Sequence, residues 1–442
     1  MMSESKHNDL KEWYISNFNL FENKLNGNSE SPFHTIRKSA ISAFADLGFP
    51  TTKNEEWRHT NIAPILKHKF KIAKADDAVD RDTVKRFTFS HLDQNILVFV
   101  NGHYSERLSV LTSLPNDVVI SSLNKAFTEN RALLESHLGK YAEFSKETFT
   151  ALNTAFAEDG AVIRVPDNVT VPQPLHIIYV NSSADEHIAS PRNLILMGKG
   201  SQLKLIESYH GISNSSYFTN MVTEVYVAEN ANLEYVKYQD QGKTAFHVSN
   251  TNICQQRNSV FSQVTLDLGG SFVRNNTNVL LNDINCETHL LGFFLGKENQ
   301  LIDNHTFIDH AKPHCFSNEL YKGILDDKST GVFNGKILVR PDAQKTNALQ
   351  SNKTLLLTND AAIHAKPQLE IFADDVKCTH GATIGQLDDE ALFYLRARGI
   401  GEEVAGAMLR HAFISDVLSH IDIPELRQIL DDRIIEHFKN IA

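Results

Sequence analysis

The spacing of apolar residues at the start of the chain is that of amphipathic helices. From Leu10 to Leu25, large apolar side chains recur every three or four positions, which predicts a helix with one buried face. A second helix is expected to open at Ser31-Pro32 and to end at Gly48, because proline fits a first helical turn and glycine commonly follows a last one. Other elements predicted in this mainly helical region are a short strand at 96–100, before the turn Asn101-Gly102, and helices within 123–138 and 144–156.

The pattern changes between about Ala161 and Gly385, where short β-branched runs are separated by glycine, asparagine and aspartate. Within 260–268, apolar and polar side chains alternate, which predicts a strand with one buried and one polar face. Small or polar residues precede a strand at both Gly200-Ser201 and Asn230-Ala231, a spacing of 30 residues that falls within the range of repeat architectures. A sandwich is the alternative, but stacked β turns better explain so many strands without Asn-Gly hairpins.

Helical spacing returns after Gly385, over 388–398, 404–418 and, beyond Pro424, to 438. This tail either caps the open end of a solenoid or offers a docking surface to another subunit. We therefore expect three domains. These are a mainly helical domain with a small β element at 1–158, a β core at 159–387 and a helical domain at 388–442.

The charge balance and the cysteines narrow the classes of function. The chain has 43 lysines plus arginines against 54 aspartates plus glutamates, a net charge of −11 that repels nucleic acid and anionic membranes. The four cysteines, Cys254, Cys286, Cys315 and Cys378, are too sparse for a disulfide framework and contain no Cys-x-x-Cys pair. A reducing compartment fits them best. Since we find neither a signal-peptide core nor an apolar run of about 18 residues, we expect a cytoplasmic protein.

Motifs of several enzyme classes are missing from the sequence. Lys237 stands where a phosphate-binding loop ending in Gly242-Lys243-Thr244 would need a glycine, which argues against a P-loop ATPase. We find no nucleophile elbow, zinc-protease helix or dinucleotide-binding glycine loop. A β-helix enzyme acting on carbohydrate remains an alternative, disfavoured because such enzymes are usually exported.

Two segments concentrate residues that bind metals. The first segment is 305–315, which contains His305, His310, His314 and Cys315. These side chains either bind a metal ion or, in the alternative, the histidines hydrogen-bond inside the β turns.

The second segment is 374–381, DDVKCTHG. Residues two apart in a strand face the same side, so Cys378 and His380 would offer two ligands to one metal. The alternative is a structural cysteine beside a hydrogen-bonded histidine. Iron in a cluster typically takes four thiolate or imidazole ligands, so the others would come from elsewhere in this chain or from another chain.

Long segments of the sequence resemble the SufB/SufD family of iron-sulfur cluster assembly proteins. The resemblance is carried by VFNGKILVRPDAQKTNALQSNKTLLL (332–357), PQLEIFADDVKCTHGATIGQLDDEALFYLRARGI (367–400) and, upstream, DNHTFIDHAKPHCFSNELYKGIL, PTTKNEEWRHTN (50–61) and ILVFVNGHYSERLS (96–109). Three features are similar to the SufD branch of this family. They are the form Cys378-Thr379-His380-Gly381, a Phe393-Tyr394 pair without a following cysteine, and the lack of an N-terminal cysteine motif.

The resemblance implies a right-handed parallel β-helix between helical N- and C-terminal domains. It also implies a non-catalytic scaffold that pairs with SufB and binds the SufC ATPase through its C-terminal helices. On this basis a docking face at Leu392–Ile421 would be rimmed by Glu402, Glu403, Arg410 and Asp416. The resemblance also leaves open a homodimer of the isolated chain.

By the same resemblance, His380 matches the histidine that helps to hold a nascent iron-sulfur cluster at the SufB interface, and Cys378 matches its neighbouring cysteine. The cluster would be transient, with no cofactor tightly bound to the isolated chain. The alternative is a purely structural subunit without metal ligands. The 305–315 segment would either guide iron or stabilise the β turns.

Overall fold

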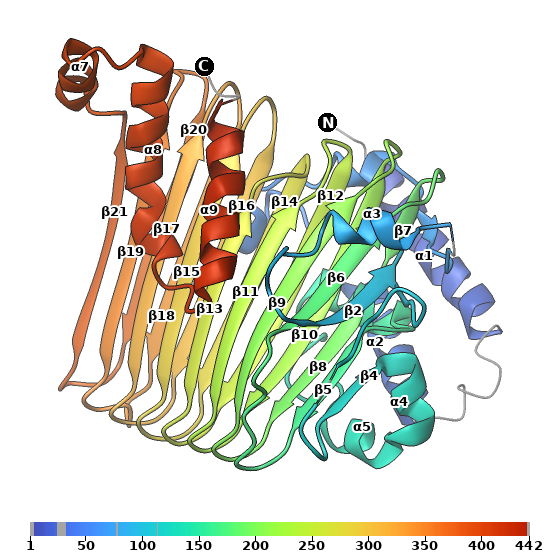
Figure 1. Ribbon diagram of the computed structural model, residues 1–442. Helices are drawn as coiled ribbons and strands as arrows, with labels where there is room; N and C mark the ends of the chain where they lie inside the picture. The colour runs from blue at the N-terminus through green and yellow to red at the C-terminus, as the bar shows by residue number, and fades with distance from the viewer. Residues whose placement is uncertain (1–3, 24–31, 77, 113, 440–442) are drawn as a thin grey trace.

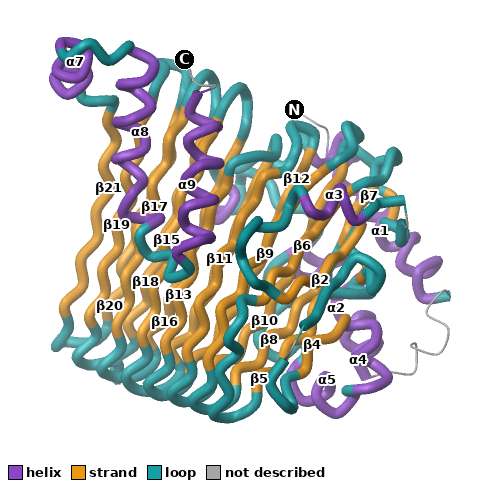
Figure 2. The backbone as a smooth tube through the Cα atoms, viewed as in Figure 1, coloured by secondary structure: helices purple, strands orange, loops and turns teal. Residues whose placement is uncertain are grey.

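The computed structural model describes residues 4–23, 32–76, 78–112 and 114–439, and most of these residues form a parallel β-solenoid with helices at both ends (Figure 1). Successive strands alternate between two sheets, here called sheet A and sheet B, and each pairs in parallel with the strand one turn earlier. The strands run side by side along the whole solenoid (Figure 2). The mainly β fold expected from the sequence, a parallel solenoid flanked by helices, is confirmed.

The solenoid is built from long, regular strands. Sheet A contains β5 (Ala161–Val165), β8 (Arg192–Met197), β10 (Tyr217–Val227), β12 (Ala245–Gln255), β14 (Phe272–Leu281), β16 (Leu301–His310), β18 (Thr330–Val339) and β20 (Ala362–Ile371), with β4 (Val119–Ser122), β7 (His187–Ala189) and β1 (Lys71–Ile72) at its start. Sheet B contains β3 (His103–Tyr104), β2 (Asn95–Val100), β6 (Leu175–Asn181), β9 (Gln202–Gly211), β11 (Asn232–Asp240), β13 (Val260–Asp267), β15 (Glu287–Gly296), β17 (Phe316–Leu325), β19 (Asn347–Leu356) and β21 (Lys377–Gly385).

One corner of the solenoid explains the repeat seen at 200 and 230. There, each turn has a residue with positive φ followed by a small buried residue, as in Asn230-Ala231 and Asn258-Ser259. Asparagine and glycine tolerate this left-handed backbone better than most residues do. The same pair of positions recurs at Gly200-Ser201, Asn285-Cys286, His314-Cys315 and Lys345-Thr346.

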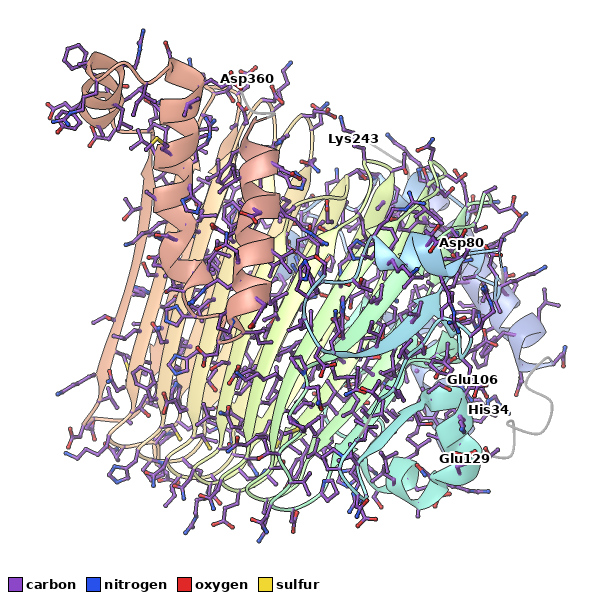
Figure 3. The ribbon with its side chains drawn as sticks, viewed as in Figure 1. His34, Asp80, Glu106, Glu129, Lys243 and Asp360 are labelled. Carbon is purple, nitrogen blue, oxygen red and sulfur yellow. The ribbon has the colours of Figure 1, made fainter. Side chains whose placement is uncertain are left out.

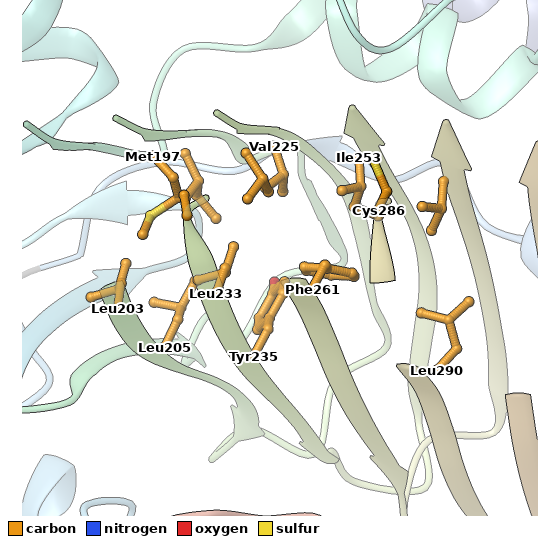
Figure 4. Packing of buried hydrophobic residues seen from close by; sticks show 14 of the residues in the cluster. Met197, Leu203, Leu205, Val225, Leu233, Tyr235, Ile253, Phe261, Cys286 and Leu290 are labelled. Carbon is orange, nitrogen blue, oxygen red and sulfur yellow. The ribbon is translucent and has the colours of Figure 1, made fainter. Parts of the chain in front are cut away.

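The interior of the solenoid is apolar near this corner and polar farther along the strands. Figure 4 shows the apolar part, where Val225 and Ile253 of sheet A face Leu233 and Phe261 of sheet B. The alternation predicted for 260–268 is present, but both faces of β13 are buried. Val264 and Leu266 face outward under the C-terminal helices, whereas Phe261 and Asp267 lie inside, and Asp267 accepts a 2.9 Å hydrogen bond from Asn275.

Most N-terminal helices cover the outer face of sheet A near its first strands, whereas the short helix that contains Val84 packs with β2 and β6 of sheet B. Helix α2 (Pro32–Leu47) ends as expected, with Gly48 at a φ of 63° donating its N–H to the carbonyl oxygen of Phe44. Leu25 and Ser31, where the first two helices were expected to end and begin, lie outside the described residues. The other N-terminal helices are α1 (Glu4–Glu22), η2 (Glu55–Trp57), η3 (Ile65–Lys67), α3 (Arg81–Lys85, capped by Asp80, Figure 3), α4 (Leu123–Glu129), α5 (Arg131–His137) and α6 (Thr148–Phe156).

The C-terminal helices lie along the outer face of sheet B and do not cover the end of the solenoid (Figure 1). Ile414 and Val417 of α8 (Glu402–Leu418) and Leu430 of α9 (Pro424–Lys439) are buried in the cluster that these helices share with sheet B. The expectation of an end cap is therefore wrong for this tail. Short α7 (Asp389–Ala397) extends past the last strand, and none of its side chains is buried.

Of the residues expected on the rim of a docking face, Arg410 is instead part of this packing, and Asp416 contacts it. Arg410 is buried and donates to the carbonyl oxygen of Phe438, while Asp416 pairs with Lys322 of β17 at 2.7 Å. Of these four residues Arg410 alone is buried, whereas Glu402, Glu403 and Asp416 remain exposed. None of the described helices combines the length and apolar composition of a membrane span.

Candidate functional site

The last turn of the solenoid is open. In the described part of the chain, β20 pairs only with β18, and β21 pairs only with β19, so each strand has one free edge. Most residues of β21 are exposed, in contrast to the buried strands of the preceding turns. Free strand edges present unpaired backbone N–H and C=O groups, which are templates for pairing with another chain.

Cys378 and His380 lie on β21 and face the same way. Their Cα partners on β19 are Ala348 and Gln350, both of which are buried inside the solenoid. Because side chains at matched positions of parallel turns stack on one another, Cys378 and His380 continue the interior of the solenoid at its open end. Cys378 packs partly against the interior apolar cluster, whereas His380 is exposed.

Partial burial changes the chemistry of the cysteine. It raises the pKa of the Cys378 thiol, because burial disfavours the thiolate. A metal ion that bound this sulfur would have to displace its proton. The free chain thus holds a protonated thiol beside an exposed imidazole, a pair that offers at most two ligands.

A column of polar side chains leads from the interior to His380. Glu319, Gln350 and His380 are Cα partners on β17, β19 and β21, three successive turns. Gln350 donates from Nε2 to Oε2 of Glu319 at 2.8 Å, and Thr306 contacts the other carboxyl oxygen. Burial raises the pKa of Glu319 to about 7. The sequence analysis did not single out Glu319 or Gln350, although the spacings of 31 and 30 residues match the solenoid period.

Apolar side chains surround the open end. Phe372, which follows β20, is 62 % exposed, and Ile384 on β21 is 52 % exposed. Leu349 and Ile371 are also exposed large apolar residues on the last strands. Apolar groups gathered beside free strand edges are typical of a surface that another protein covers.

The 305–315 segment does not form one site. His305 lies on the outer face of sheet A, with Nε2 at 2.9 Å from Asp303 and Nδ1 at 3.4 Å from Glu56. His310 is buried and hydrogen-bonds to Ser317 at 2.9 Å, while His314 occupies a corner turn. Nowhere in the described ranges do three or more histidine, cysteine, aspartate or glutamate side chains gather as metal ligands would. His310 is therefore a hydrogen-bonded residue inside the β turns, whereas His305 joins the N-terminal region to sheet A.

A contact between Arg274, Trp57 and Asp303, which the sequence analysis also missed, lies beside this segment and fixes η2 to sheet A. The guanidinium carbon of Arg274 lies 3.8 Å from the ring centroid of Trp57, and Nη1 of Arg274 pairs with Asp303 at 2.6 Å. Burial alone would raise the pKa of the Asp303 carboxyl, but the positive charges of Arg274 and His305 lower that pKa to about 2. Nothing in the spacing of 57, 274 and 303 indicates that these residues meet, because the contact joins two domains.

Comparison with known proteins gives matches along most of the chain. Residues 179–413 match the SUF system FeS cluster assembly SufBD core domain, and residues 8–177 match the SufBD protein N-terminal region. An iron-sulfur cluster assembly SufBD family protein of Synechocystis is 32 % identical over 91 % of this chain and 90 % of its own length. The iron-sulfur cluster assembly proteins SufD of Escherichia coli and Bacillus subtilis are 30 % and 26 % identical, over 95 % and 89 % of this chain and 95 % and 91 % of their own lengths.

Proposed function

The chain belongs to the SufBD family of iron-sulfur cluster assembly proteins, and from this premise we propose that it is a SufD-type scaffold subunit. In this proposal it pairs with a SufB-like paralogue through the open end of the solenoid and binds a SufC-like ATPase through its C-terminal helices. A nascent cluster is assembled at the paired ends and passed on. The observation that carries the proposal is the position of Cys378 and His380 at an uncovered solenoid end.

The open end favours a partner of the same architecture. A second solenoid end would pair with the free edges of β20 and β21 and cover Phe372 and Ile384 in one step. Two copies of this chain could use the same surface through a twofold axis, which would give a homodimer in the absence of the paralogue. In the complex, the paralogue takes the place of the second copy.

The two ligands on β21 are suited to a cluster that is held only while the partners meet. Iron-sulfur clusters generally need four protein ligands, so Cys378 and His380 leave the remaining positions to the paralogue. A site divided between two chains is weakened when the chains move apart. The cluster is therefore the cargo of this protein, and no catalytic step is assigned to the chain.

The helices α7 and α8 offer the surface for the ATPase. Phe393 and Tyr394 of α7 are 74 % and 55 % exposed, and Val404 and Met408 lie exposed on the first turns of α8. Glu402 pairs with Arg396 at 3.1 Å at the edge of this patch. Because α7 extends beyond the last strand, an ATPase bound there would lie next to the open end, where its motion can separate the paired solenoids.

The pairing is tested by placing a charge on the open end. We expect Ile384→Asp to abolish co-purification with the SufB-like paralogue, because an aspartate would be buried without a partner at the interface. Ile212→Asp is the matched control, since Ile212 is an equally apolar, 46 % exposed residue after β9, far along the chain from this end. If Ile384→Asp pairs as tightly as Ile212→Asp, the proposed interface is wrong.

A further inference from the structure

The interior column that ends at His380 contains a buried side-chain amide whose carbonyl oxygen accepts no hydrogen bond. Gln350 is 3 % exposed, and its Nε2 donates to Glu319 at 2.8 Å. Its Oε1 is buried and has no hydrogen-bond partner in the described part of the chain. A buried carbonyl oxygen without a donor costs about 1–3 kcal/mol, so such atoms call for an explanation.

The amide of Gln350 is held in one orientation. Glu319 is 1 % exposed and is itself fixed by Thr306 on the facing strand. The carboxyl Oε2 accepts from Gln350 whether Glu319 is ionised or carries its proton on the oxygen that contacts Thr306. Gly335 packs against the other side, where even an added Cβ would collide with Nε2 of Gln350. With Nε2 directed to the earlier turn, Oε1 is left for the following one.

The residue in the following turn is His380. It is the Cα partner of Gln350, one turn nearer to the open end, and its side chain projects on the same face. An imidazole N–H is a donor of the right kind for an amide oxygen. Histidines that bind metals generally donate their second ring N–H to such an acceptor, which fixes the tautomer and the direction of the ring.

We propose that Gln350 is a positioning residue for His380. By a turn of its exposed imidazole, His380 donates one ring N–H to Oε1 of Gln350, a hydrogen bond that the structure itself does not contain, and the other ring nitrogen then carries the lone pair and points out of the open end. This inference rests on the proposed function, because it gives the imidazole its role as a ligand. It adds that the ligand is set by the interior of this chain before a partner arrives. Glu319 takes part only by holding the amide.

The direct test is the tautomer of His380 in the isolated full-length chain, measured by nitrogen-15 NMR with labelled histidine. The His380 signals are assigned by their loss in His380→Ala. We expect one dominant neutral tautomer in the wild type and a mixture in Gln350→Met, which keeps the length of the side chain but has no amide oxygen.

Asn352→Leu is the matched control for burial. Asn352 is on the same strand and fully buried, but its Cα partner in the last turn is Ala382. It should leave the His380 signals as in the wild type. The proposal is overturned if Gln350→Met has the wild-type tautomer, or if Asn352→Leu disturbs His380 as much as Gln350→Met does.

A second readout separates this inference from the proposed function. In the complex reconstituted with the paralogue and the ATPase, we expect Gln350→Met to shorten the half-life of the bound cluster about tenfold, the usual effect of losing such a second contact. A tautomer change in Gln350→Met together with an unchanged cluster in His380→Ala would retain the hydrogen bond and overturn ligation. An unchanged tautomer in Gln350→Met together with a lost cluster in His380→Ala would retain ligation and overturn the hydrogen bond.

Discussion

Cys286 and Cys315 lie on successive turns of the solenoid and donate to the same acceptor, the carbonyl oxygen of Asp283, with sulfur-oxygen distances of 3.1 and 3.3 Å. Both belong to the column of small corner residues. In neighbouring turns this position is occupied by Ser259 and Ser201, whose hydroxyls donate to the carbonyl oxygens three residues earlier at 2.6 and 2.7 Å. Cys286 therefore closes its corner turn as the serines do, whereas Cys315 bonds to the preceding turn.

This relationship predicts that Cys286→Ser is well tolerated. A serine hydroxyl would make the bond to Asp283 that serines make elsewhere in the column, so the free energy of unfolding should change by less than about 1 kcal/mol. Cys286→Leu should destabilise by about 1–3 kcal/mol, because the packed interior has no room for the larger side chain. Chemical denaturation of the two variants measures the difference. Equal losses would show that the sulfur itself, not the size and the hydrogen bond, is required.

The buried ion pair between Arg192 and Glu224 predicts a larger loss. Both side chains are fully buried, 2.7 Å apart, and Glu224 also accepts the backbone N–H groups of Gly139 and Tyr141. Arg192→Met would leave a buried carboxylate without its counter-ion and should cost about 3–5 kcal/mol. Lys85→Met, which breaks the exposed pair with Asp82, should have little effect on the same denaturation curve. A loss no larger than that of Lys85→Met would contradict the account of this contact.

Glu319 predicts part of the pH dependence of stability. Its pKa is raised to about 7 in the folded chain, above the usual value near 4.5, so the folded state binds the proton more tightly than the unfolded state does. The contribution of Glu319 is fully present below about pH 4.5 and is lost as the pH rises through about 7. Glu319→Gln should therefore flatten the fall in the free energy of unfolding between pH 5 and pH 7. An unchanged slope would mean that Glu319 does not titrate in this range.

Substitutions on the two faces of α8 are expected to affect stability and ATPase binding separately. Val417→Asp places a charge in the cluster under α8 and should lower the unfolding free energy by several kcal/mol. Met408→Asp changes an exposed side chain of the same helix and should leave the unfolding temperature unchanged while weakening binding of the ATPase. Calorimetry and a pull-down with the ATPase test both. Retained binding in Met408→Asp would remove this patch from the docking surface.

The fold was largely predictable because its determinants are local. Several signals determine the backbone within a few positions of the chain, so they are visible in the sequence. They are the glycine at 48 that ends a helix, the left-handed corner residues and the helical spacing after Gly385. The paired positions 200 and 230 already held the period of the solenoid. The same period places Glu319 and Gln350 in the column of His380, and applying it to the polar residues would have found them.

Other features depend on contacts that local patterns do not contain. Trp57 meets Arg274 across more than two hundred residues, and the inner face of α8 is distinguished from its outer face only by the sheet that it covers. Arg410 was therefore expected on a rim and is instead buried, where it donates to the carbonyl oxygen of Phe438. The polar face of β13 lies inside for a similar reason, since partners such as Asn275 come from the opposite sheet.

The central claim is that β21 supplies a ligand to a cluster shared with the paralogue. The most direct measurement is anaerobic reconstitution, with iron and sulfide, of the complex co-purified with the SufB-like and SufC-like partners, followed by visible absorption and iron counting. His380→Ala is compared with Thr379→Ala, whose exposed side chain lies on the other face of the same strand. We predict that both complexes assemble and that only His380→Ala loses the cluster. A full cluster in His380→Ala would contradict the claim and leave this chain as architecture alone.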